Sequence, residues 1–239
     1  MAPSPPPSKP KTASTENSSS SPPKKKQPHF SMVREFALAD FITLCNGVCG
    51  TVSIFCSASF LKTNDTSFLW TAVGALPLGF LFDALDGNVA RWRKQESLLG
   101  QELDSLADLV SFSVAPAMLA FAAGMDSAAD CAILTYFICC GIARLARYNA
   151  TVELIKKQTG KAKITHFEGT PVPTTLLLDV IVAWFLSKGW IADALPYGVV
   201  ELGAWPGVGG VIIHPIVLMY GLSGTLQISK SLRVPKPFS

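Results

Sequence analysis

The sequence predicts an all-α integral membrane protein with about six transmembrane helices, both termini in the cytosol and a short interfacial helix before the first span. Composition is the first reason, because 49% of the 239 residues are hydrophobic and only 15% are charged. Soluble domains usually carry about 25% charged residues. The second reason is a series of six apolar stretches, and the third is a one-sided distribution of positive charge.

Four parts are expected along the chain. Residues 1–28 are rich in Pro, Ser, Thr and Lys and contain no apolar run, so we expect a disordered cytosolic tail there. Residues 29–40 mix apolar and polar side chains and suit an amphipathic helix that lies in the membrane interface. We expect the membrane domain over 41–230 and a cytosolic C-terminal tail over 231–239.

The membrane domain contains apolar stretches close to the roughly 20 residues that a helix needs to cross the hydrocarbon core. They lie at 41–61, 68–90, 105–125, 128–147, 171–188 and 211–229. The segment between the last two, 189–210, contains Gly, Pro, Trp and two acids. We expect it to form a loop or a re-entrant segment, with a seventh crossing as the alternative.

Positive charge tests this arrangement. If the N-terminus lies in the cytosol, 18 of the 20 Lys and Arg residues fall in cytosolic segments, and only Lys62 and Lys188 face the other side. The positive-inside rule therefore favours two cytosolic termini and an even number of spans.

Two classes of site are not expected. The six cysteines all lie in or beside apolar segments without a CxxC pair, and the three histidines are scattered, so neither a zinc site nor a disulfide framework is indicated. The lysine cluster at 24–26 lies in the tail rather than on a folded surface. Nucleic acid is therefore not an expected partner.

Acidic residues gather where the second and third spans meet. Asp83 and Asp86 are three residues apart, and Asp104 and Asp108 are four apart, which places each pair on one face of a helix. A tight cytosolic turn would make the two helices antiparallel neighbours, and the four carboxylates could then converge. Four like charges near a membrane need cations to neutralise them, and oxygen ligands without His or Cys favour Mg²⁺, Mn²⁺ or Ca²⁺.

Two neighbouring residues add to this pattern. Gly87 leaves room for a phosphate or a ribose to approach the backbone, and Arg91 offers a planar fork that matches phosphate oxygens. Two metal ions at the acids could clamp a pyrophosphate. The alternative is a solvated cytosolic hairpin in which the acids pair with nearby basic residues, but the apolar neighbours of Asp83 and Asp108 argue against it.

Together these residues form one run, Asp83-x2-Asp86-Gly87-x2-Ala90-Arg91-x8-Gly100-x3-Asp104-x3-Asp108. The run resembles the complete signature of the CDP-alcohol phosphatidyltransferase family in every position. The signature covers 26 residues, and the family's six-span fold would cover about residues 35–230. The resemblance implies transfer of a phosphatidyl group from CDP-diacylglycerol to a small alcohol, within a homodimer surrounded by membrane lipids. It also implies two Mg²⁺ or Mn²⁺ ions and an active site that faces the cytosol, in the endoplasmic reticulum.

The resemblance assigns roles to individual residues. One metal ion would be held by Asp83, Asp86 and Asp104, and a second by Asp83, Asp104 and Asp108, with Asp108 also acting as the general base. The residues expected to bind CDP-diacylglycerol are Asn46, Gly87, Ala90, Arg91, Ser97 and Gly100. For Asn46 the alternative is a polar residue whose partners are neighbouring helices.

Other segments indicate the acceptor alcohol. Residues 140–151 and 167–175 resemble the phosphatidylserine synthase branch of the family, which uses L-serine and releases CMP. Arg144 and Arg147 lie at the cytosolic end of the fourth span, where either could bind the serine carboxylate. They could instead anchor the helix at the interface or contact lipid phosphate.

Two alternative functions remain open. Within the same reaction class the acceptor could be inositol or glycerol 3-phosphate. In a different class, the four acids could form the pathway of a divalent-cation transporter. The acids cluster at one membrane face, and no chain of polar residues crosses the other spans, so we favour the enzyme.

Overall fold

The computed structural model describes residues 38–93, 98–159, 166–168, 172–203, 211–229 and 233–235. These residues belong to one compact unit, Phe36–Ser239. The helices are α2 (Leu38–Thr63), α3 (Thr66–Arg93), α4 (Leu98–Leu109), α5 (Ala115–Ala122), α6 (Ala128–Thr159), α7 (Leu176–Ser187) and α8 (Leu218–Ile228). The predicted tail, 1–28, and most of the predicted interfacial helix lie outside the described residues, and residues 38–40 form the first turn of α2.

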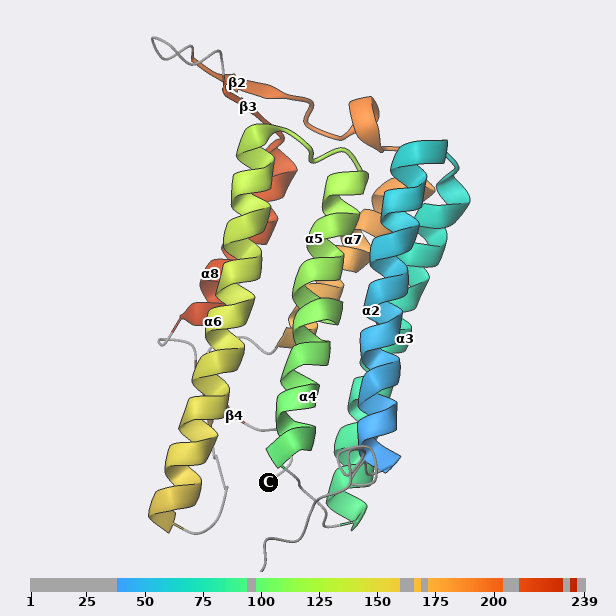
Figure 1. The fold of residues 1–239 in the computed structure, drawn as a ribbon. Helices are drawn as coiled ribbons and strands as arrows, with labels where there is room; N and C mark the ends of the chain where they lie inside the picture. The colour runs from blue at the N-terminus through green and yellow to red at the C-terminus, as the bar shows by residue number, and fades with distance from the viewer. Residues whose placement is uncertain are drawn as a thin grey trace, which may run out of the picture. The chain divides into compact units, whose positions relative to one another are not determined.

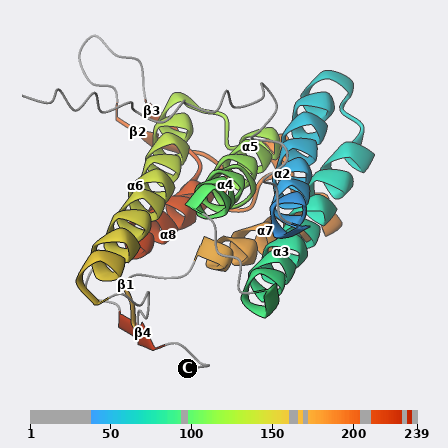
Figure 2. The same cartoon turned by 60° about the horizontal axis from the view of Figure 1, so that its bottom comes forward.

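The long helices pack as a bundle (Figure 1). α2 and α3 form an antiparallel pair, and α6 pairs with α8. α4 continues through the π-helical turn η1 (Val110–Val114) into α5, and this continuous segment lies between the two pairs. The turned view in Figure 2 shows the same arrangement, with α7 packed against α3 and α5.

Four helical segments are long and apolar enough to cross a membrane. They are Asp40–Thr63, Thr66–Val89, Leu99–Ala122 and Ala128–Thr151. These segments correspond to the first four predicted spans, so the integral membrane character and four of the six helices are confirmed.

The last two predicted spans differ from the expectation. α7 has 12 residues and α8 has 11, which gives each a length of roughly 16–18 Å, less than the hydrocarbon core of about 30 Å. The 3₁₀ turns η2 (Val172–Thr175) and η4 (Pro215–Val217) precede them. Pro173 and Pro215 lack a backbone N–H and favour the first turn of a helix, which explains why no α-helix extends further towards the N-terminus. The count of six spans therefore stays a prediction.

Short strands, which the all-α prediction omitted, occur at both ends of the bundle. β1 (His166–Glu168) pairs antiparallel with β4 (Arg233–Pro235), and β2 (Val200–Leu202) pairs antiparallel with β3 (Val211–Ile213). The described part of the segment 189–210 consists of turns, the 3₁₀ turn η3 (Ala192–Ala194) and β2. It contains no seventh helix within residues 189–203.

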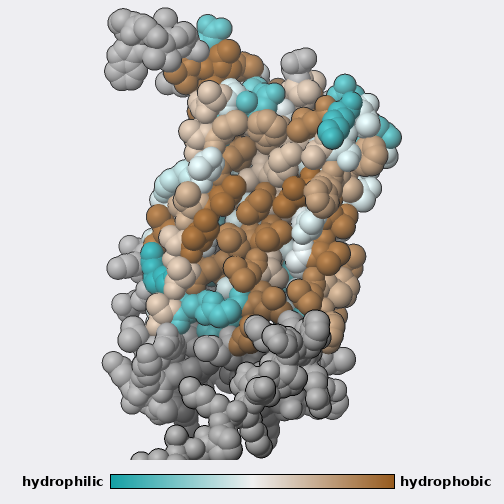
Figure 3. All heavy atoms as spheres, viewed as in Figure 1, coloured by the Kyte–Doolittle hydropathy of each residue, from teal (hydrophilic) through white to brown (hydrophobic). Residues whose placement is uncertain are grey.

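Helix α2 shows why the bundle suits a lipid environment. Its buried face carries polar side chains: Thr43, Asn46, Ser53 and Ser57. Its outer face is apolar, and Phe41, Val48 and Phe55 are 56%, 60% and 67% exposed. Small and polar residues at helix contacts, with large apolar residues outside, are typical of membrane bundles. Figure 3 shows apolar residues across much of the middle of the face in view.

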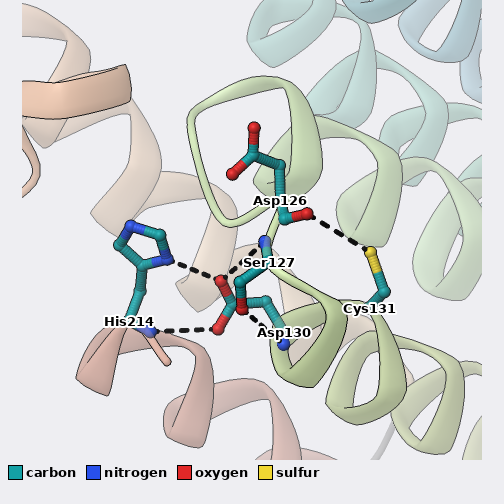
Figure 4. Close-up of polar contacts among 5 residues, drawn as sticks. All are labelled: Asp126, Ser127, Asp130, Cys131 and His214. Carbon is teal, nitrogen blue, oxygen red and sulfur yellow. Dashed lines mark hydrogen bonds and ion pairs between the residues drawn. The ribbon is translucent and has the colours of Figure 1, made fainter. Parts of the chain in front are cut away.

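A polar clasp joins the starts of α6 and η4 (Figure 4). The Asp130 carboxylate accepts a hydrogen bond from the backbone N–H of Ser127 at 3.2 Å, and the backbone N–H of Asp130 donates to Ser127 Oγ at 3.1 Å. The same carboxylate accepts from the backbone N–H of His214 at 3.0 Å and lies 2.6 Å from His214 Nδ1. The clasp therefore caps α6 and ties it to the segment that leads into α8.

Candidate active site

Three acids from two helices converge in the structure. Asp83 lies in the C-terminal part of α3, and Asp104 and Asp108 lie on one face of α4. One carboxylate oxygen from each of the three lies within 4.8 Å of the other two. These are the three acids that the resemblance assigns to the second metal ion.

Asp86, the fourth predicted ligand, is held apart from this group. It is 5% exposed and accepts a hydrogen bond from the Thr43 hydroxyl of α2 at 2.5 Å. Its charge still acts on Asp83 and Asp104. Sequence reasoning did not find Thr43. Its spacing of three residues before Asn46, on the polar face of α2, is the signal that could have identified it.

Asn46 belongs to α2 and lies next to both α3 and α4. Its amide Nδ2 donates to Asp108 Oδ1 at 3.2 Å, and its side-chain oxygen is 3.0 Å from the position that a Cβ on Gly79 would take. The backbone carbonyl of Asn46 accepts a hydrogen bond from the Ser111 hydroxyl at 2.9 Å. The structure thus gives Asn46 a contact with the predicted general base, while its contact with the nucleotide stays a prediction.

The π-helical turn η1 follows Asp108 directly and presses against α2. A Cβ on Gly50 would lie only 2.6 Å from Ser111 Oγ and 2.8 Å from Ser111 Cα, so only glycine permits this approach. π-helical turns inside α-helices are frequent at functional sites. Here the turn and Asp108 both contact Asn46, through Ser111 Oγ at 2.9 Å and Asp108 Oδ1 at 3.2 Å.

The structure separates the two candidate arginines. Arg147 donates from Nη1 to the backbone carbonyl of Ile228 at 3.2 Å and so caps the end of α8. Asp108 lies near enough to act electrostatically on Arg144, whose Nε is buried without a hydrogen-bond partner among the described residues. Of the two arginines, Arg144 is therefore the one whose Nε could donate a hydrogen bond to a ligand that lies near the acids.

The predicted contacts for CDP-diacylglycerol are described only in part. Apart from the backbone of its own helix and its chain neighbours, nothing among the described residues lies within 4 Å of the position that a Cβ on Gly87 of α3 would take. Gly100 is half-buried in the first turn of α4. Ser97 and the side chains of Ala90 and Arg91 lie outside the described residues.

A second polar group braces α4 against α6. Asn149 Nδ2 donates to Ser105 Oγ at 3.0 Å, and Gln101 Nε2 lies 3.5 Å from Asn149 Oδ1. The segment 140–151 carries the predicted resemblance to one branch of the family and the two candidate arginines, but sequence reasoning did not find Asn149. Asn149 lies two residues beyond the fourth predicted span, 128–147, so hydropathy gave no signal that its side chain would face α4.

The donor set fits a divalent cation. Asp104 Oδ1 is buried and has no hydrogen-bond partner among the described residues, and such an oxygen is costly unless a cation or a donor satisfies it. The three converging groups are all carboxylates, which favour Mg²⁺ or Mn²⁺ over softer metals. The residues present could therefore hold at least one such ion.

Comparison with known proteins agrees with this chemistry. The family model for CDP-alcohol phosphatidyltransferases matches residues 36–213. A CDP-diacylglycerol–serine O-phosphatidyltransferase from Saccharomyces cerevisiae is 46% identical over 209 residues, which cover 87% of this chain and 74% of the relative. A protein of the same name from Bacillus subtilis is 35% identical over 146 residues, 60% of this chain and 73% of the relative. An archaetidylserine synthase from Methanothermobacter thermautotrophicus is 34% identical over 160 residues, 66% of this chain and 60% of the relative.

Proposed function

The chain belongs to the CDP-alcohol phosphatidyltransferase family, in its phosphatidylserine synthase branch, and we propose that it transfers a phosphatidyl group from CDP-diacylglycerol to L-serine. The products are phosphatidylserine and CMP. The observation that carries this proposal is the group of three carboxylate oxygens within 4.8 Å, whose members occupy the acidic positions of the family signature.

Asp108 is the proposed general base. It takes the proton from the serine hydroxyl, whose oxygen attacks the β-phosphorus that bears diacylglycerol. The new P–O bond forms as the bond between this phosphorus and the bridging oxygen breaks, and CMP leaves with that oxygen. The amide of Asn46, 3.2 Å from Asp108 Oδ1, orients the carboxylate for this step.

Two divalent cations are proposed at the acids, one held by Asp83, Asp86 and Asp104 and the other by Asp83, Asp104 and Asp108. Asp86 would turn from Thr43 to take part. When bound, Mg²⁺ or Mn²⁺ would neutralise the carboxylates and the pyrophosphate and stabilise the charge on the departing CMP. Asn46, Gly87, Ala90, Arg91, Ser97 and Gly100 are proposed to contact the donor.

Arg144 is the proposed ligand for the serine carboxylate. Serine differs from ethanolamine only by this group, so discrimination between the two must act on it. The Nε of Arg144 is buried near Asp108 and has no partner within the described part of the chain, which supports this assignment over Arg147. The wider proposal is a homodimer in the endoplasmic reticulum, with six spans and the active site facing the cytosol.

The test is CMP release from CDP-diacylglycerol by the purified protein with L-serine, inositol, glycerol 3-phosphate and ethanolamine. We expect turnover with L-serine, loss of turnover in EDTA, and recovery with Mg²⁺ or Mn²⁺. Release of CMP with inositol or glycerol 3-phosphate but not with serine would overturn the acceptor. Full turnover after exhaustive chelation would overturn the metal site.

A further inference from the structure

Gln227 is a polar residue that the reaction described above does not use. It lies one residue before the end of α8 and is fully buried, on the same face as Tyr220 and Gly224. Neither its amide nitrogen nor its amide oxygen has a hydrogen-bond partner among the described residues. An amide left unpaired inside a membrane bundle is costly, so its presence indicates a ligand.

Ser113 faces the same point from the other side. It belongs to η1, it is fully buried, and its hydroxyl also has no partner in the described part of the chain. The position of a Cβ on Gly141 of α6 would lie 2.3 Å from Ser113 Oγ and 3.9 Å from Gln227 Oε1. Two oxygens without a partner in the described structure, one from η1 and one from α8, therefore both lie within 4 Å of this position on α6.

This pair adjoins the proposed site of reaction. Arg144 follows Gly141 by three residues on α6 and so lies on the same side of that helix. Asp108 lies near enough to act electrostatically on Arg144. Ser113 follows Asp108 by five residues through the π-helical turn. The order along the bundle is thus a carboxylate, a guanidinium and then two neutral oxygens.

We propose that Gln227 and Ser113 bind the ammonium group of the acceptor amino acid. The inference rests on the proposed function and names what selects a zwitterion among alcohols. Gln227 Oε1 and Ser113 Oγ accept hydrogen bonds from the ammonium group, Arg144 binds the carboxylate, and Asp108 receives the hydroxyl. An alcohol without an amino group leaves both oxygens unpaired, and discrimination is strong when buried polar groups of a site lose their partners.

The decisive variant is Gln227→Leu in the full-length protein, assayed by CMP release. We expect the KM for L-serine to rise about tenfold to a hundredfold, because a hydrogen bond to a charged group is lost, while the KM for CDP-diacylglycerol changes less than about twofold. As a second readout, 3-hydroxypropionate, which is serine without its amino group, should inhibit wild type and variant equally.

Matched variants separate recognition from packing. Gln227→Glu keeps an acceptor for the ammonium group and should retain most serine affinity even if Gln227→Leu folds poorly. Tyr220→Phe removes another buried hydroxyl on the same face of α8, one that also has no partner among the residues the structure describes, and should leave the serine KM unchanged.

Two results would overturn the inference while the proposed function stands. One is an unchanged serine KM in Gln227→Leu, and the other is a parallel loss of affinity for serine and 3-hydroxypropionate. A wild-type protein that does not use serine at all would overturn the proposed function itself, and the inference with it.

Discussion

At Asp108 the environment of one carboxylate comes from three separate stretches of the chain. Asp83 and Asp104 supply neighbouring carboxylates, and Asn46 supplies an amide donor from α2. The spacing in the sequence predicted that the acids would converge, because residues three and four apart share a helix face. It did not predict that Asn46 would reach Asp108, because pairing between residues 62 apart depends on how α2 packs.

Replacing Asp108 with Asn tests its role as general base. The amide keeps the shape of the side chain but cannot take the serine proton, so we expect turnover to fall about 10²–10⁴-fold. Turnover is measured by CMP release, and donor affinity is measured beside it because the substitution also removes a metal ligand. Asp65→Asn serves as the control, since Asp65 is exposed in the turn between α2 and α3. Turnover near that of wild type would remove Asp108 from this role.

At the scale of elements, the close contact between α2 and η1 adjoins Asp108, the proposed base, which directly precedes this turn's N-cap residue. A Cβ on Gly50 would meet backbone as well as side-chain atoms of Ser111, and a backbone cannot rotate away. The π-helical turn was not predicted. Such a turn holds one residue more than an α-helical turn, and the apolar stretch within residues 105–125 has no feature that reveals the extra residue.

Gly50→Ala therefore has an expected outcome. The added methyl group separates α2 from η1, which should lower the melting temperature in detergent and reduce turnover at least tenfold through misplacement of Asp108. Gly74→Ala on α3 is the matched control, because no described residue outside its own helix lies within 4 Å of the added Cβ. Equal effects from the two substitutions would contradict the proposed role of the contact.

The clasp at the start of α6 predicts the opposite pattern. Asp130→Ala leaves the backbone N–H groups of Ser127 and His214 without their acceptor, which costs about 1–3 kcal/mol. We expect a lower melting temperature but normal turnover in the protein that stays folded, because the acids lie in α3 and α4, whereas the clasp lies at the start of α6, beyond the C-terminal end of α5. Asp126→Ala is the control, since the Asp126 side chain is exposed. An unchanged melting temperature would show that the clasp does not stabilise the bundle.

At the scale of the whole molecule, hydropathy predicted the long helices and was least informative for the short ones. α2, α3, the segment from α4 to α5, and α6 each contain an apolar stretch long enough to span. Residues 171–188 and 211–229 are as apolar by composition, yet each contains a 3₁₀ turn, and the second also contains a strand. Hydropathy measures only apolar content, and proline and strand pairing decide how much of it becomes helix.

Membrane topology gives the last prediction. In Figure 1 the turn between α2 and α3 and the strands β2 and β3 lie at one end of the bundle, and the C-terminal end of α6 lies at the other. Lysine and arginine concentrate in the segments that leave this second end, which should therefore face the cytosol.

We expect a membrane-impermeant maleimide to label Thr151→Cys in sealed microsomes, and to label Asp65→Cys and Glu201→Cys only after permeabilisation. Each variant carries its single cysteine in a background with the six native cysteines replaced, whose CMP release is checked first. Labelling of Asp65→Cys and Thr151→Cys from the same side would contradict the bundle's spanning of the membrane, whereas a full reversal would invert its orientation and place the acids on the luminal side.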